Sequence, residues 1–156
     1  KMEPSETTRA LAECEFFQGM EENDLTSIAG ICEERRCQAG EAIFRQGDFG
    51  EQLFVIVDGQ IHLERSMRIG TRTGNVVIEA LGKGRVLGCW STLLGEPHHH
   101  MSSACCQKPT IVLAIRGAEL REMMLSNVKS GFTVLERLCL SLRDRMAIAY
   151  GAMEKI

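Results

Sequence analysis

The sequence predicts a mainly β fold with flanking helices: an antiparallel β roll, similar to a double-stranded jelly roll, with short N-terminal helices and a long C-terminal helix. Two observations predict this class. Short runs rich in Val, Ile, Leu and Phe alternate with glycine-containing turns through the middle of the chain, as in antiparallel sheets. Towards both ends, apolar residues instead recur every three or four positions, which is the period of an amphipathic helix.

The chain of 156 residues is long enough to bury one hydrophobic core, so a single domain is expected. Residues 1–9 are polar, and we expect them to form a flexible lead-in to a domain that occupies residues 10–156. Within that domain, helices are predicted over about residues 10–34, the β roll over about 37–116, and C-terminal helices over about 117–154.

Spacing and composition place the individual elements. Near the N-terminus, the helical period is carried by Leu11, Cys14, Phe17, Leu25, Ile28 and Cys32. Strands are predicted at the apolar runs over residues 42–45, 53–57, 61–65, 76–81, 85–88, 102–106 and 110–115. Near the C-terminus, one apolar stripe runs through Phe132, Leu135, Leu138, Leu142, Met146, Ala149 and Met153. This stripe predicts a single long amphipathic helix.

Composition excludes several classes of protein. The formal net charge is -3, and the 18 basic residues are scattered among 21 acidic ones, so no basic tail for nucleic acid or membrane is expected. No apolar run is long enough to span a bilayer. The seven cysteines contain no CxxC pair, and the N-terminus carries no secretory signal, so we expect a reducing cytoplasmic location.

Two stretches of the predicted roll carry a resemblance to a known family. The segments 38–61 and 77–88 resemble the cyclic nucleotide-binding domain of the catabolite activator protein, of protein kinase A regulatory subunits and of related transcription regulators. In that family, glycines make the turns between the opening strands, as Gly40, Gly47 and Gly59 are placed to do here. The resemblance extends over about residues 10–145 and implies a cyclic nucleotide-binding fold.

The resemblance implies a phosphate-binding cassette that contains Leu87, Gly88, Cys89, Trp90, Ser91, Pro97, His98 and His99. In the family, backbone amides at a helix start hold the cyclic phosphate, an arginine neutralises it, and a glutamate accepts the ribose 2'-hydroxyl. When Gly88 and Pro97 are aligned with the family's glycine and proline, Cys89 stands at the glutamate position and His98 at the arginine position. Cyclic nucleotide binding is therefore predicted to be weak, altered or absent.

A metal or haem site is an alternative for the same region. His98, His100, Cys105 and Cys106 are residue types that bind metals, and some relatives in this family sense gases through haem. Their spacing is not one that fixes a coordination geometry, since no helical HxxxH motif or CxxC pair is present. The competing interpretation is a polar loop that leads into a strand with a buried cysteine.

The resemblance also implies a role for the last helix. In the family, the long helix after the roll pairs with its twin, and ligand binding alters how that helix docks. The residues spaced close to a heptad seam are Leu135, Leu138, Leu142, Met146 and Ala149. We therefore predict a homodimer through this helix; the alternative is that the stripe covers the domain's own roll.

The leading prediction is a non-enzymatic regulatory sensor domain. Its ligand would be cAMP, cGMP or another small anion, and binding would change the position of the last helix. The rival is an interaction module that has lost its ligand and keeps the fold for dimerisation or partner docking. No enzyme is predicted, because no Ser/His/Asp order, paired carboxylates or nucleotide-hydrolysing loop stands out. DNA-binding relatives carry a helix-turn-helix domain after this helix, so this chain, which stops at Ile156, is expected not to bind nucleic acid directly.

Overall fold

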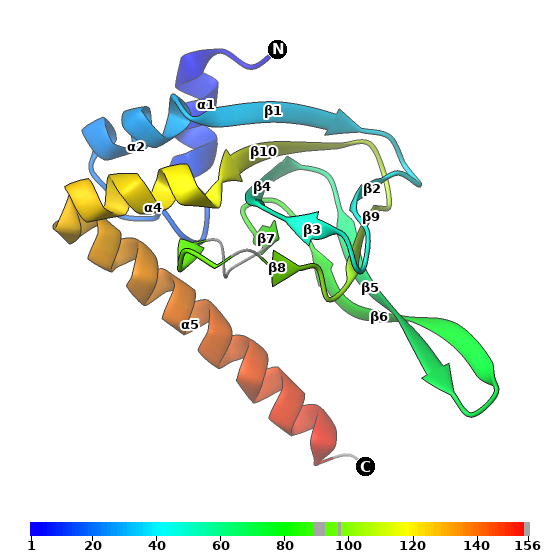
Figure 1. The fold of residues 1–156 in the computed structure, drawn as a ribbon. Coiled ribbons are helices and arrows are strands. Elements are labelled where there is room, and N and C mark those ends of the chain that lie inside the picture. The colour runs from blue at the N-terminus through cyan, green and yellow to red at the C-terminus, as the bar shows by residue number, and fades with distance from the viewer. Residues whose placement is uncertain (89–92, 97, 155–156) are drawn as a thin grey trace.

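The computed structural model of the chain describes residues 1–88, 93–96 and 98–154 (Figure 1). Two helices, α1 (Pro4–Ala12) and α2 (Glu22–Ala29), precede the strands, and α4 (Gly117–Ser126) and α5 (Val128–Met153) follow them. The strands are β1 (Cys32–Cys37), β2 (Ala42–Phe44), β3 (Phe49–Gly50), β4 (Gln52–Asp58), β5 (Ile61–Ile69), β6 (Arg72–Leu81), β7 (Val86–Gly88), β8 (His98–His99), β9 (Ser103–Cys106) and β10 (Thr110–Arg116). The predicted order of helices, roll and helices is confirmed.

The strands form two four-stranded antiparallel sheets, in the orders β1-β10-β4-β7 and β2-β9-β5-β6, and a two-stranded ribbon of β3 and β8. One hydrophobic core, here called the roll core, contains residues from both larger sheets, including Phe44, Ile56, Ile61, Leu81, Leu87 and Val112. The predicted antiparallel β roll is therefore confirmed.

The central strands β4 and β10 are buried on both faces. Along β4, Phe54 and Ile56 belong to the roll core, whereas the alternate residues Leu53 and Val55 belong to a second core against the helices. This helix-side core also holds Leu11, Phe16, Phe17, Leu25, Ile28, Leu93, Leu113, Leu120, Val134 and Leu138. Double-sided burial explains why β4 and β10 are almost continuously apolar in sequence instead of alternating.

The N-terminal boundaries differ from those expected. The helix α1 begins at Pro4, inside the segment 1–9 that we expected to be a flexible lead-in, and it buries Thr7 and Leu11. Proline suits the first helical turn because its missing N–H would have no intrahelical partner there. The lead-in prediction is therefore wrong for residues 4–9.

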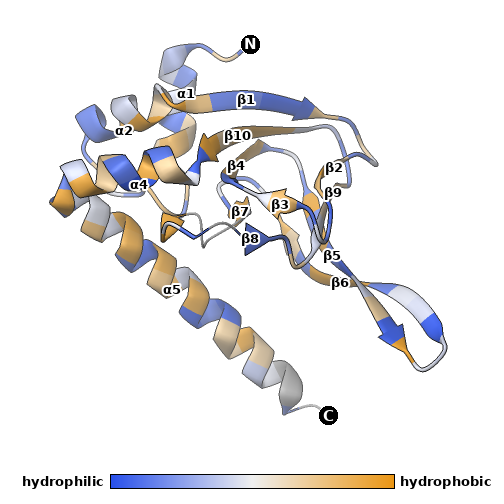
Figure 2. Cartoon of the chain, in the orientation of Figure 1, coloured by the Kyte–Doolittle hydropathy of each residue, from blue (hydrophilic) through white to orange (hydrophobic). Residues whose placement is uncertain are grey.

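The roll also begins earlier than expected. The predicted helical segment extended to about residue 34, but β1 starts at Cys32 and pairs with β10 from Cys32 opposite Ile115 to Cys37 opposite Thr110. Figure 2 shows much of β1 in the hydrophilic colour, which suits a charged strand at the edge of a sheet. Pairing with β10, a contact distant in sequence, overrides the helical spacing that ends at Cys32.

The helix α5 is amphipathic, as Figure 2 shows by its alternating colours, but its apolar residues divide between two environments. Leu138 is only 4% exposed and belongs to the helix-side core, so it cannot lie on an outer dimer seam. Leu135, Leu142 and Met146 are 38%, 41% and 55% exposed, and Cys139 and Ala149 are also exposed. The outward stripe of α5 therefore follows Leu135, Cys139, Leu142, Met146 and Ala149.

The hairpin of β5 and β6 is longer than the predicted runs and projects from the roll (Figure 1). Within the described part of the chain, no helix combines the length and the hydropathy needed to cross a membrane.

Candidate functional site

The strand β7 positions the first residues of the predicted cassette. It pairs with β4, with Val86 opposite Val55, Leu87 opposite Phe54 and Gly88 opposite Leu53. Leu87 is 1% exposed and belongs to the roll core, whereas Val86 belongs to the helix-side core. The strand that leads into the cassette is therefore fixed by both cores of the domain.

Gly88 occupies a position that only glycine accommodates. Its φ angle is +121°, and a Cβ atom built there would lie 2.6 Å from the carbonyl oxygen of Gln52. A side chain would require both a disfavoured left-handed backbone and a displacement of β4. The close approach of β7 to β4 thus gives a local structural reason for the glycine at the start of the cassette.

Leu93 anchors the other side of the cassette to the C-terminal helices. Its side chain is fully buried in the helix-side core, together with Leu120 of α4 and Val134 and Leu138 of α5. The Nη1 group of Arg121 donates a hydrogen bond of 3.1 Å to the carbonyl oxygen of Leu93. A displacement of Leu93 would therefore change the packing of α4 and α5.

Of the predicted cassette residues, the structure places Leu87, Gly88, His98 and His99, while Cys89, Trp90, Ser91 and Pro97 lie outside the described residues. His98 and His99 form β8, where His98 is opposite Gly50 and His99 is opposite Phe49. Both histidines are exposed. The Nδ1 atom of His99 lies 3.0 Å from the carbonyl oxygen of Gly47, and its ring meets Phe49 edge-on. Pairing of β8 with β3 thus holds the return segment of the cassette against the roll.

His100 packs as part of the roll wall. It is 8% exposed, and its ring stacks on Phe44 with 3.6 Å between the ring centroids. Its backbone N–H donates to the Asp48 carbonyl, and its carbonyl accepts from the Gly47 N–H, each at 2.8 Å. Burial lowers the pKa of His100 below its ordinary value; the charge of Asp48 opposes this shift and His98 adds to it. His100 is therefore neutral at pH 7.

The candidate metal ligands lie in different surroundings. Cys106 is 1% exposed in the roll core, whereas Cys105, the next residue on β9, is partly exposed. Burial is the largest cause that raises the pKa of each thiol above its ordinary value. Among the residues that the structure describes, no group of three or more His, Cys, Asp or Glu could hold a metal ion. The described geometry therefore gives no support to the metal or haem alternative.

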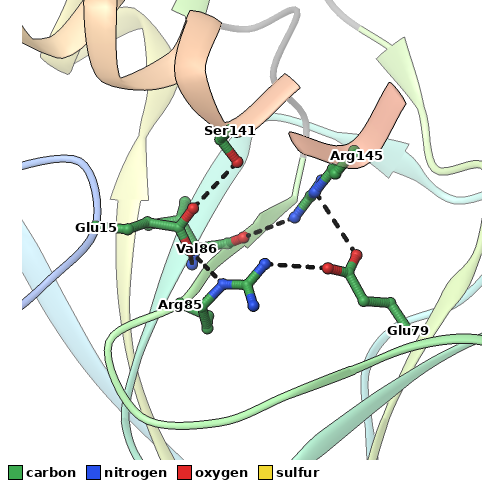
Figure 3. Close-up of polar contacts among 6 residues, drawn as sticks. All are labelled: Glu15, Glu79, Arg85, Val86, Ser141 and Arg145. Carbon is green, nitrogen blue, oxygen red and sulfur yellow. Dashed lines mark hydrogen bonds and ion pairs between the residues drawn. The ribbon is translucent and has the colours of Figure 1, made fainter. Parts of the chain in front are cut away.

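A polar network joins β7 to α5, and it is called the Glu15 network here (Figure 3). Its members are Glu15, Glu79, Arg85, Val86, Ser141 and Arg145. Glu15 lies between α1 and α2, and its Oε2 atom accepts hydrogen bonds from the Nε of Arg85 at 2.8 Å and the N–H of Val86 at 2.9 Å. Its Oε1 atom accepts from the Oγ of Ser141 at 3.1 Å. One carboxylate thus connects the N-terminal segment, the cassette strand and α5.

Glu79 forms the second centre of the Glu15 network. Its carboxylate lies 3.0 Å from the Nη2 of Arg85 and 3.6 Å from the Nε of Arg145. The Nη2 of Arg145 also donates to the Val86 carbonyl at 3.4 Å. Burial alone would lower the pKa of Arg85, but Glu15 and then Glu79 outweigh it and raise the pKa above its ordinary value. Arg85 therefore stays charged, and α5 is tied to the strand two residues before Gly88.

Sequence reasoning missed the Glu15 network. Apart from the bond between Arg85 and Glu79, which are six positions apart, its hydrogen bonds join residues 59 to 126 positions apart, as in Arg145 to Val86 and Ser141 to Glu15. In the sequence, Arg145 is one of several charged residues on the last helix, and nothing local distinguishes it from Arg143. Only the approach of α5 to β7 separates the two arginines: Arg145 reaches the roll, whereas Arg143 pairs with the adjacent Asp144 on the surface.

We predict that Gly88→Ala destabilises the protein more than Gly70→Ala. Both glycines have positive φ, but no atom lies within 4 Å of a Cβ built at Gly70, so only backbone strain is expected there. Urea denaturation should show a loss of about 1 kcal/mol for Gly70→Ala and about 2 kcal/mol or more for Gly88→Ala. Equal losses would contradict the proposed clash with Gln52.

We also predict that His100 reduces stability in mild acid. Because its pKa is lowered in the folded state, the unfolded chain takes up a proton first, and stability is lost as the pH falls below the ordinary value of 6.5. His100→Phe preserves an aromatic ring against Phe44 but removes the titration. Urea midpoints between about pH 7.5 and 5.5 should fall less in this variant than in the natural sequence. Parallel profiles would rule out this contribution.

Comparison with known proteins identifies the family. Residues 34–127 match the family model described as the cyclic nucleotide-binding domain. The structure is similar to a cyclic nucleotide-binding domain from Methylobacillus flagellatus, with a TM-score of 0.80 and 19% identity over 98% of this chain and 84% of that chain. A search of curated proteins finds no match to this sequence.

Two further solved structures show the same fold in regulatory proteins. The catabolite activator protein of Thermus thermophilus has a TM-score of 0.68 and 25% identity, over 90% of this chain and 62% of that one. The regulatory domain of PKA from Toxoplasma gondii, solved with cAMP, has a TM-score of 0.62 and 20% identity, over 81% of this chain and 45% of that one. The family match covers well over half of the sequence, and the chain belongs to the cyclic nucleotide-binding domain family.

Proposed function

We propose that this chain is a non-enzymatic, cytoplasmic sensor domain in which a ligand held at the cassette changes the position of α5. One observation carries this proposal: both described sides of the cassette are bonded or packed to the C-terminal helices. On the β7 side, Val86 joins Arg145 through the Glu15 network, and on the other side Leu93 is buried in the same core as Leu138 of α5. A ligand that moves either side must change the contacts of α5.

The ligand class follows from the family. The Toxoplasma gondii relative was solved with cAMP, so cAMP, cGMP or another small anion is the candidate ligand for this chain. In the alignment that we propose, with Gly88 and Pro97 at the family's glycine and proline, Cys89 stands at the glutamate position and His98 at the arginine position. Each replacement removes a charge-assisted hydrogen bond worth about 1.5 to 3 kcal/mol. We therefore propose that an ordinary cyclic nucleotide binds weakly or not at all.

Two sets of contacts connect the cassette to α5, one polar and one apolar. The Glu15 network is half-buried, with side-chain exposures of 22% for Glu15 and 23% for Arg145, so solvent screens it less than an exposed ion pair. The helix-side core supplies the apolar part through Leu93. Both sets of contacts end on α5, so a displacement on either side of the cassette would act on the same helix.

The same helix provides the proposed output surface. Leu135, Cys139, Leu142, Met146 and Ala149 lie on the outward face of α5, at spacings of three and four residues that suit a coiled-coil seam. We propose that two copies of the chain associate through this stripe. The rival function, an interaction module without a ligand, shares this dimer, so only ligand binding distinguishes the two.

Restoring the family residues should strengthen ligand binding. We expect the double variant Cys89→Glu/His98→Arg to bind cAMP or cGMP at least about tenfold more tightly than the natural sequence in titration calorimetry. The matched control is Cys89→Glu/His62→Arg, which has the same charge change with the arginine on β5, outside the predicted cassette. Equal affinities in the two double variants would show that the alignment of His98 is wrong. If the natural sequence bound cAMP or cGMP with micromolar affinity, the proposal that its cassette binds cyclic nucleotides weakly would be contradicted.

Charge on the outward stripe should disrupt the dimer. We expect Leu142→Lys/Met146→Lys to sediment as a monomer, because two ammonium groups would enter an apolar seam. The control is Ile148→Lys, since Ile148 is 69% exposed but lies off the stripe, and this variant should stay dimeric. A natural sequence that sediments as a monomer, or a control that dissociates equally, would contradict the proposed dimer.

A further inference from the structure

A groove that the sensor function does not use lies between α2, α4 and the first turns of α5. It has a volume of about 530 Å³, which is within the range of sites that hold a drug-sized ligand or a few side chains. In Figure 1, α2 and α4 lie at the end of the molecule opposite the tip of the β5 and β6 hairpin. The groove is therefore separate from the projecting hairpin, and helices supply most of its lining.

The floor of the groove is apolar and adaptable. Ile28, Leu120 and Val134 are 2%, 1% and 1% exposed, and all three line the groove. Met123 and Met124 line it beside them, and methionine side chains readily adjust to different apolar partners because they are unbranched and flexible. This floor is suited to receive a large aliphatic side chain.

The rim of the groove is acidic. Asp24, Glu119 and Glu122 line it, and no Lys, Arg or His is among its described lining residues. Asp24 is held in place because its carboxylate accepts hydrogen bonds from the Oγ of Ser130 and the Nδ2 of Asn127. Glu119 lies 3.8 Å from Arg116, an exposed pair that water screens strongly. The rim therefore presents net negative charge around an apolar floor.

We propose that this groove docks a basic amphipathic helix of a partner protein. The apolar face of such a helix would place a leucine-like side chain on the floor of Ile28, Leu120 and Val134, and its lysines or arginines would face the acidic rim. Charge complementarity favours this occupant over an acidic or uncharged segment. An apolar floor with an open, charged rim is the pattern expected of a groove that accepts a helix.

The position of the groove connects the partner to the sensor. Leu120, Met124 and Val134 form its floor and belong to the same helix-side core as Leu93 of the cassette. A helix seated in the groove would therefore contact residues that also support the cassette. Docking itself does not depend on whether the cassette binds a nucleotide, so the inference stands independently of the ligand proposed above.

The inference can be tested with a labelled synthetic helix of leucine and lysine and with the full chain, using fluorescence anisotropy. Ser27 is exposed on α2 and lines the groove, so Ser27→Trp fills its mouth without disturbing the core. We expect this variant to bind the peptide at least about tenfold more weakly. Thr26→Trp is the matched control, because Thr26 is exposed on the same helix outside the groove, and its affinity should be unchanged.

A second pair of variants tests whether the acidic rim itself, and not the net charge of the protein, attracts the peptide. Glu119→Gln/Glu122→Gln should weaken peptide binding, whereas Glu6→Gln/Glu154→Gln, with the same change in net charge at exposed sites elsewhere, should not. Equal weakening in both pairs, or unchanged binding in Ser27→Trp, would overturn the proposal in favour of non-specific attraction. If Ser27→Trp instead dissociates a dimer of this chain in sedimentation, a second copy occupies the groove and the proposal also fails.

Discussion

The carboxylate of Glu15 is the interaction on which the arrangement of this domain depends. It accepts hydrogen bonds from Arg85, from the Val86 N–H and from Ser141, so the N-terminal segment, the cassette strand and α5 share one half-buried acceptor. Removing a partner from such a half-buried cluster leaves another charge or polar group without compensation. A displacement of one of these three parts would therefore disturb the hydrogen bonds of the other two, as the proposed sensor function requires.

The sheet of β1, β10, β4 and β7 extends this constraint through the interior. Its two faces belong to different cores, because alternate residues of β4, such as Phe54 and Leu53, enter the roll core and the helix-side core. Interiors are densely packed, so a displacement on one face is transmitted to the other. The strand β7 pairs with β4 at the edge of this sheet and contacts both cores, through Leu87 in the roll core and Val86 in the helix-side core.

The resemblance in sequence predicted the architecture well, and it did so through local features. Glycine turns and apolar runs predicted the roll, and helical spacing predicted α5. The predictions that failed are those in which a distant contact decides the outcome. The predicted helical segment extended to about residue 34, but residues 32–34 pair with β10, and Leu138 fits a heptad seam but faces the helix-side core. Periodicity identifies an apolar face, but it does not identify the surface that the face covers.

The sequence by itself determined the family and the order of the elements, because these depend on residue identity and spacing along the chain, and it is the basis of the proposal for Cys89 and His98. The tertiary structure alone decided which arginine of α5 reaches the roll and which apolar residues of that helix remain exposed. It also decided that His100 is stacked and neutral. The physical reason is that charge pairing, burial and pKa depend on neighbours brought together from distant parts of the chain.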